Sequence, residues 1–99
     1  MLAQFSIWPL DRPHMSEDIA SITQVLDQSG VRYEVGPMGT TVEGQWQDVM
    51  AAIQACRETL LAAHQRVLTT ITIDDDATRA LNMSEATAKV TARNEEAKS

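Results

Sequence analysis

The sequence has a single cysteine and no apolar run that approaches the roughly 18 residues of a membrane-spanning helix. Cys56 alone cannot form an intramolecular disulfide. Residues 1–5 lack the basic region and the long apolar core that open a signal peptide. We therefore expect a cytoplasmic protein that has no membrane partner.

Positive charge is scarce as well. Eight lysines and arginines stand against 14 aspartates and glutamates, which gives a net charge of −6. The average field of such a chain repels nucleic-acid phosphates and anionic lipid headgroups and attracts cations. Nucleic acid is therefore not an expected partner, whereas a cationic ligand is compatible with the charge. An ordinary soluble surface also carries a charge of this size.

The residue patterns of enzymes and metal sites are missing. His14 and His64 have no partner histidine or cysteine at metal-ligand spacing. The run 74–76 is acidic, but it lacks the alternating spacing of a calcium loop, which favours a solvated turn over a cation site. No nucleophile, base and orienting residue can be assembled from spacing. We predict a protein that is not an enzyme and that needs no metal or cofactor.

Four segments show the alternation of half-buried strands: residues 2–8, 31–35, 40–43 and 66–73. The middle two are joined by the bend Gly36-Pro37-Met38-Gly39, which is typical of a hairpin turn.

Two amphipathic helices separate these strands. The first begins at the N-cap residue Ser16 and ends at Ser29-Gly30, and the second follows Gly44. The apolar stripe predicted for the second helix comprises Trp46, Val49, Met50, Ile53, Cys56 and Leu60. A short C-terminal helix over residues 84–97 is also expected, although Val90 is its only large apolar residue.

The order β-α-β-β-α-β, with right-handed crossovers, predicts one α+β domain over residues 1–99 with a ferredoxin-like sandwich. Its four-stranded antiparallel sheet carries both helices on one face. The other face is open and hydroxyl-rich, and the residues assigned to it are Gln4, Ser6, Trp8, Arg32, Glu34, Thr41, Glu43, Leu68, Thr70 and Thr72. This mixed face predicts self-association as a homo-oligomer, with Trp8 lining a site or filling the subunit interface.

Several motifs in register resemble the small thiamine-binding protein family, the single-domain proteins of the YkoF type. They are Phe5-Ser6-Ile7 with Pro9-Leu10, Tyr33-Glu34 through Pro37-Met38-Gly39-Thr40, Glu43-Gly44 with Trp46, Val49-Met50, and Leu68-Thr69-Thr70-Ile71 with Ile73-Asp74-Asp75. The resemblance covers roughly residues 2–90. It implies a ferredoxin-like subunit, assembled as a dimer or tetramer, that binds thiamine or its hydroxymethylpyrimidine part at subunit interfaces without turnover.

Carried over by position, the resemblance implies a ligand site made by Ser6, Gly39, Thr40, Thr41, Glu43 and Thr70. Hydroxyls, a carboxylate and backbone amides can pair with the donors and acceptors of an aminopyrimidine, and Glu43 or Trp8 can stabilise a thiazolium cation. Two alternatives stay open. One is a structural or regulatory oligomer without a small ligand. The other is a small hydrolase of the acylphosphatase kind, for which Arg12 is a poor anion-binding residue.

Overall fold

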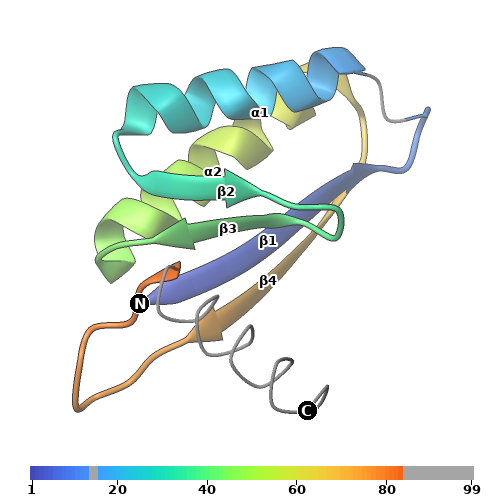
Figure 1. Ribbon diagram of the computed structural model, residues 1–99. Helices are drawn as coiled ribbons and strands as arrows, with labels where there is room; N and C mark the ends of the chain where they lie inside the picture. The colour runs from blue at the N-terminus through green and yellow to red at the C-terminus, as the bar shows by residue number, and fades with distance from the viewer. Residues whose placement is uncertain (14–15, 84–99) are drawn as a thin grey trace, which may run out of the picture.

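The computed structural model describes residues 1–13 and 16–83 of the chain. His14 and the predicted helix over residues 84–97 lie outside the described residues. The element order is β-α-β-β-α-β (Figure 1). The elements are β1 (Leu2–Pro9), α1 (Ser16–Ser29), β2 (Arg32–Val35), β3 (Thr40–Glu43), α2 (Trp46–Ala63) and β4 (Val67–Asp74).

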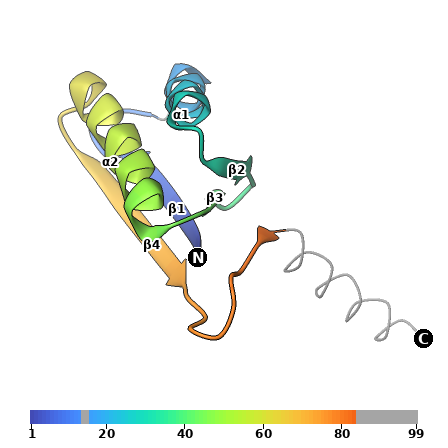
Figure 2. The same cartoon turned by 90° about the vertical axis from the view of Figure 1, so that its left-hand side faces the viewer.

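The four strands form one antiparallel sheet in the order β2-β3-β1-β4. Both helices cover the same face of this sheet, as the two perpendicular views show (Figures 1 and 2). The predicted ferredoxin-like plan is confirmed. None of the described helices is long and apolar enough to cross a membrane.

The core lies between the helices and one sheet face because apolar residues alternate along the strands and recur every turn along the helices. The buried residues of this core are Ala3, Phe5, Ile7, Leu26, Val42, Val49, Ala52, Ile53, Cys56 and Leu60. Trp46 was predicted to belong to it, and that prediction is wrong: its side chain is 54% exposed. It is the first residue of α2, and a helical side chain leans toward the N-terminus, here away from the core.

The strand registers fix the composition of the opposite, open face. Ser6 pairs with Thr70, and Trp8 pairs with Leu68. Gln4 lies between Thr41 of β3 and a threonine of β4. Residues directly opposite one another on neighbouring strands point to the same side of a sheet. The predicted assignment of hydroxyl groups and of Trp8 to the open face therefore agrees with the observed pairing.

A buried polar cluster joins the β1–α1 connection to the end of α2. His64 is the C-cap residue of α2 and is almost fully buried. Its Nε2 lies 2.9 Å from Oδ1 of Asp18, and its Nδ1 lies 3.1 Å from Oδ1 of Asp11 and 3.1 Å from Nε of Arg12. Arg12 donates to Nδ1 and the Asp18 carboxylate lies against Nε2, so both ring nitrogens have partners.

The second carboxylate oxygen of Asp11 anchors the following strand, because it accepts a 2.8 Å hydrogen bond from the backbone N–H of Gln65. This bond lowers the pKa of Asp11 below its ordinary value of 3.8. The cluster thereby fixes the loop that leaves β1 and the first turn of α1. Residues of β1 and α1, the two elements that this loop connects, form walls of the cavity described next.

Candidate functional site at the end of the hairpin

A cavity of about 340 Å³ opens where β1 extends beyond the β2–β3 hairpin. Its walls come from three segments: residues 5–8 of β1, residues 35–40 around the hairpin turn, and Ile19, Ile22 and Thr23 of α1. We call this cavity the hairpin notch. Its volume lies at the lower end of the roughly 300–1,000 Å³ typical of small-molecule sites.

The notch exists because the two ladders of β1 have different lengths. Pairing with β3 ends at Phe5 and Thr40, whereas pairing with β4 continues to Pro9 and Val67. The hairpin turns away at this point through a tight bend in which the N–H of Gly36 donates to the carbonyl of Gly39 at 2.9 Å. Within the described residues, no strand pairs with the β3-facing edge of β1 beyond Phe5.

Two hydrogen bonds show which residues of β1 face that edge. The N–H of Gly44 donates to the Met1 carbonyl on the β3 side, and the N–H of Leu10 donates to the Arg66 carbonyl on the β4 side. In an antiparallel ladder, alternate residues direct both backbone groups to the same neighbour. The backbone N–H and C=O groups of odd-numbered β1 residues therefore point toward β3, and those of even-numbered residues point toward β4.

Ile7 is the first odd-numbered residue beyond the end of the β3 ladder, and it lines the notch. Its N–H and C=O point toward the space that β3 has left. The next such residue, Pro9, has no N–H to offer. The edge of β1 in the notch therefore presents one adjacent donor and acceptor pair, held rigidly by the pairing of the same strand with β4.

Gly39 lets the hairpin approach this edge closely. Its φ is +153°, and a Cβ built on it would lie 2.8 Å from the carbonyl oxygen of Phe5. Real side chains essentially never tolerate such a distance. A larger residue would strain the backbone and push the hairpin away from β1, so glycine here sets the width of the notch.

Two apolar side chains of the lining are exposed. Ile19 continues the apolar stripe of α1, yet its side chain is 51% exposed because it lies at the notch and not over the core. Met38 at the hairpin tip is 79% exposed. Exposed apolar side chains next to a cavity are typical of binding sites. From the sequence alone, Ile19 is indistinguishable from a core residue.

The six sequence-predicted site residues fall into three groups. Ser6, Gly39 and Thr40 line the notch. Thr41 and Thr70 lie on the open face, where Thr70 pairs with Ser6 and Thr41 pairs with a glutamine of β1.

Glu43 stands apart from the others at the far end of β3. It lies three positions after Thr40, which corresponds to about 10 Å along a strand. Its Oε1 lies 3.4 Å from Nη1 of Arg32, and its Oε2 accepts a 2.8 Å hydrogen bond from the N–H of Met83. The chain after β4 thus returns to the end of β3, as Figure 2 shows. In this structure the carboxylate is occupied by contacts within the chain.

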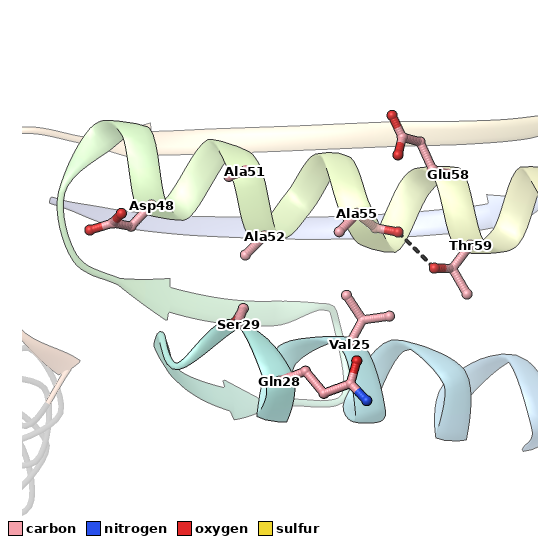
Figure 3. A pocket seen from close by; sticks show the side chains of 9 residues that line it. All are labelled: Val25, Gln28, Ser29, Asp48, Ala51, Ala52, Ala55, Glu58 and Thr59. Carbon is pink, nitrogen blue, oxygen red and sulfur yellow. Dashed lines mark hydrogen bonds between the residues drawn. The ribbon is translucent and has the colours of Figure 1, made fainter.

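A second, larger groove of about 630 Å³ runs between α1 and α2 (Figure 3). Small residues of α2, among them Ala51, Ala52 and Ala55, form its floor. Helical backbone groups are already paired within each helix, and the hydroxyl of Thr59 donates to the Ala55 carbonyl at 2.8 Å. The lining also includes the polar side chains of Gln28, Ser29, Asp48 and Glu58, but none of the predicted site residues lines this groove.

The topology and the two-layer packing define an α+β domain of the ferredoxin-like class. Comparison with known proteins narrows this class to a family. The chain belongs to the thiamine-binding protein family, because the model of that family, described as "Thiamine-binding protein", matches residues 3–91.

Relatives in curated collections support this membership. A UPF0045 protein of Methanothermobacter thermautotrophicus is 38% identical over 85 residues, which cover 80% of this chain and 86% of the relative. The UPF0045 protein YqgV of Bacillus subtilis is 32% identical over 81 residues, which cover 75% of this chain and 78% of the relative.

Solved structures share the fold. A hypothetical protein of Methanocaldococcus jannascii superposes with a TM-score of 0.83 at 22% identity, covering 91% of this chain and 94% of that one. A candidate thiamine biosynthesis or salvage protein of Thermotoga maritima gives a TM-score of 0.78 at 24% identity, covering 90% and 96%. At these identities the likeness shows the fold alone.

Proposed function

We propose that the protein binds thiamine or a related hydroxymethylpyrimidine in the hairpin notch and does not convert it chemically. Family membership supports the class of ligand. The observation that carries the location is the edge of β1 at Ile7, which faces a small apolar cavity with no strand beside it among the described residues. The Thermotoga protein of the same fold, a candidate thiamine biosynthesis or salvage protein, is named for the same class of ligand.

The aminopyrimidine ring suits this edge. Its exocyclic amino group donates a hydrogen bond, and the adjacent ring nitrogen accepts one. The C=O and N–H of Ile7 offer the complementary acceptor and donor on one side of an extended strand. Hydroxyl groups of Ser6 and Thr40 lie in the same lining, and Ile19 and Ile22 offer apolar surface to the ring faces.

We further propose that the open face pairs with a second copy of the chain. Trp8 and Leu68 lie opposite each other on that face, and each is more than half exposed. Trp8 also lines the notch, so a partner seated on the open face would lie beside the bound ligand. Thr41 and Thr70 would then contribute across the subunit boundary. Light scattering checks this assembly, because a mass of 10.9 kDa at every concentration would contradict it.

Calorimetric titration with hydroxymethylpyrimidine and with thiamine tests the binding. We expect saturable heat with both ligands and at least tenfold weaker binding of a pyrimidine that lacks the amino group, because each lost hydrogen bond leaves a polar group unpaired. The absence of any saturable heat would overturn the proposed function.

A pair of matched variants tests the location. Ile19→Trp places an indole in the notch, whereas Ile73→Trp adds a similar bulk at an exposed residue of β4 that pairs with Ala3 and lies outside both the notch and the proposed interface. We expect at least tenfold weaker binding for Ile19→Trp and little change for Ile73→Trp. Equal effects of the two substitutions on affinity would contradict a ligand site in the notch.

A further inference from the structure

The buried contact between Asp18 and His64 lies at one end of the wall that α1 contributes to the notch. We propose that these two residues position this wall, and with it the apolar surface that receives the ligand, although neither of them lines the notch. The inference rests on the proposed function, because it specifies how the same site is held in shape.

The buried residues of α1 bracket its contribution to the notch. They are Asp18 in the first turn and Leu26 two turns later. The notch residues of α1, which are Ile19, Ile22 and Thr23, all lie between these two positions. Eight positions along a helix correspond to about 12 Å. The helix is therefore fixed to the rest of the protein at both ends of the notch wall.

The two fixed points differ in kind. Leu26 is fully buried in the apolar core. Asp18 is held by a polar contact, in which its Oδ1 lies 2.9 Å from Nε2 of His64. Ile19 is 51% exposed, so apolar packing at this end of the helix is weak. Apolar burial is non-directional, whereas a hydrogen bond fixes both a distance and a direction. The contact with His64 therefore sets the orientation of this end of α1.

The imidazole of His64 is itself held firmly. His64 is the C-cap residue of α2, and its backbone N–H donates to the carbonyl of the core residue Leu60 at 2.9 Å. The Nδ1 atom lies 3.1 Å from Nε of Arg12 and 3.1 Å from Oδ1 of Asp11. Only 1% of the His64 side chain is exposed. The ring therefore gives Asp18 a rigid partner that is connected to the core through α2.

Loss of the Asp18 contact would leave Leu26 as the buried fixed point of α1. A small rotation of the helix about Leu26 moves Ile19 most, because Ile19 is the notch residue of α1 farthest from that point. A gap of about 0.5–1 Å already removes a quarter to a half of the dispersion attraction between two groups. Ligand affinity should therefore depend on this contact, although Asp18 lies outside the notch lining.

Three variants test the positioning role. Asp18→Ala removes the contact, whereas Asp18→Asn keeps a side chain of the same shape that can still form a hydrogen bond with an imidazole nitrogen. Val49→Ala is a control for general loss of stability, because Val49 is a fully buried core residue beside Gly44, outside the notch lining. In calorimetric titration with hydroxymethylpyrimidine, we expect about fivefold weaker binding for Asp18→Ala and a change within about twofold for the other two variants.

The methyl signals of Ile19 in the ligand-free protein give a second measurement, which we expect to shift in Asp18→Ala and to stay in place in Val49→Ala. If Asp18→Ala does not fold, Asp18→Ser replaces it, since serine is well tolerated at the start of a helix and its side chain is shorter. Wild-type affinity in the alanine or serine variant, or an equal loss of affinity in Asp18→Asn or Val49→Ala, would overturn the positioning role. Failure of the unsubstituted protein to bind would overturn the proposed function itself, while unshifted Ile19 signals in Asp18→Ala would overturn the positioning role alone.

Discussion

The close approach of Gly39 to β1 gives the sharpest stability prediction. In Gly39→Ala, the added Cβ would meet the carbonyl oxygen of Phe5 at 2.8 Å while the backbone keeps a φ of +153°. The positive φ alone costs about 1–3 kcal/mol for a residue with a side chain. The clash adds to this because Phe5 and Thr40 form the last pair of the β1–β3 ladder, so the carbonyl cannot move without loosening that pair.

A second glycine separates the two contributions. Gly30 follows the last residue of α1 at φ +76°, and a Cβ built there would meet nothing within 4 Å. Gly30→Ala therefore reports the backbone cost alone, about 1 kcal/mol. We expect Gly39→Ala to lower the free energy of unfolding by about 3 kcal/mol, since it adds the steric term to the backbone term.

Urea and thermal unfolding of the two variants measure the difference. At about 4–8 °C per kcal/mol for a domain of this size, Gly30→Ala should lower Tm by about 5 °C and Gly39→Ala by about 15 °C. Ligand affinity should fall only in Gly39→Ala, because that residue sets the width of the notch. If Gly39→Ala destabilises the protein no more than Gly30→Ala, the result would contradict the close approach of the hairpin to the Phe5 carbonyl.

Three further predictions concern groups outside the notch. His64→Ala should lower the free energy of unfolding by about 3 kcal/mol, because it removes a buried hydrogen-bond partner of the Asp18 carboxylate and leaves a cavity; an unchanged midpoint of urea unfolding would contradict this. Burial raises the pKa of Cys56 to about 11, so its alkylation at pH 8 should be slow in the folded protein and fast in urea; similar rates would contradict the burial. The stabilising contribution of Asp11 is present above pH 3.8 and is lost as pH falls through its lowered pKa, so Asp11→Asn should flatten the acid-unfolding profile.

Much of the fold could be predicted because its determinants are local. Alternation placed the strands within one residue of their observed ends, and Thr40–Glu43 was located without error. The end of the first helix before Gly30 and the apolar stripe of the second helix could also be predicted from residues that are close in sequence. The prediction that Trp46 is buried was wrong because periodicity identifies the apolar side of a helix but does not reveal where the core ends along the helix axis.

The site depends on contacts between distant residues, which single-sequence patterns do not encode. The notch follows from the difference in length between two ladders of β1, and no spacing in the sequence reports that difference. The exposure of Ile19 and the role of the Ile7 backbone follow from the same geometry. His64 contacts Asp11 and Asp18, which lie 53 and 46 positions earlier in the sequence. No pattern of neighbouring residues could therefore predict its burial.

The central claim is that the β1 edge at Ile7 recognises the aminopyrimidine ring. Amide chemical shifts of the ¹⁵N-labelled protein, followed during titration with hydroxymethylpyrimidine, test it most directly. We predict saturable shifts of the N–H groups of Ile7, Gly39 and Thr40, with the largest for Ile7 as its proton enters a hydrogen bond. Shifts confined to the groove between the helices, around Ala52 and Ala55, or an unmoved Ile7 amide at saturation, would contradict the account.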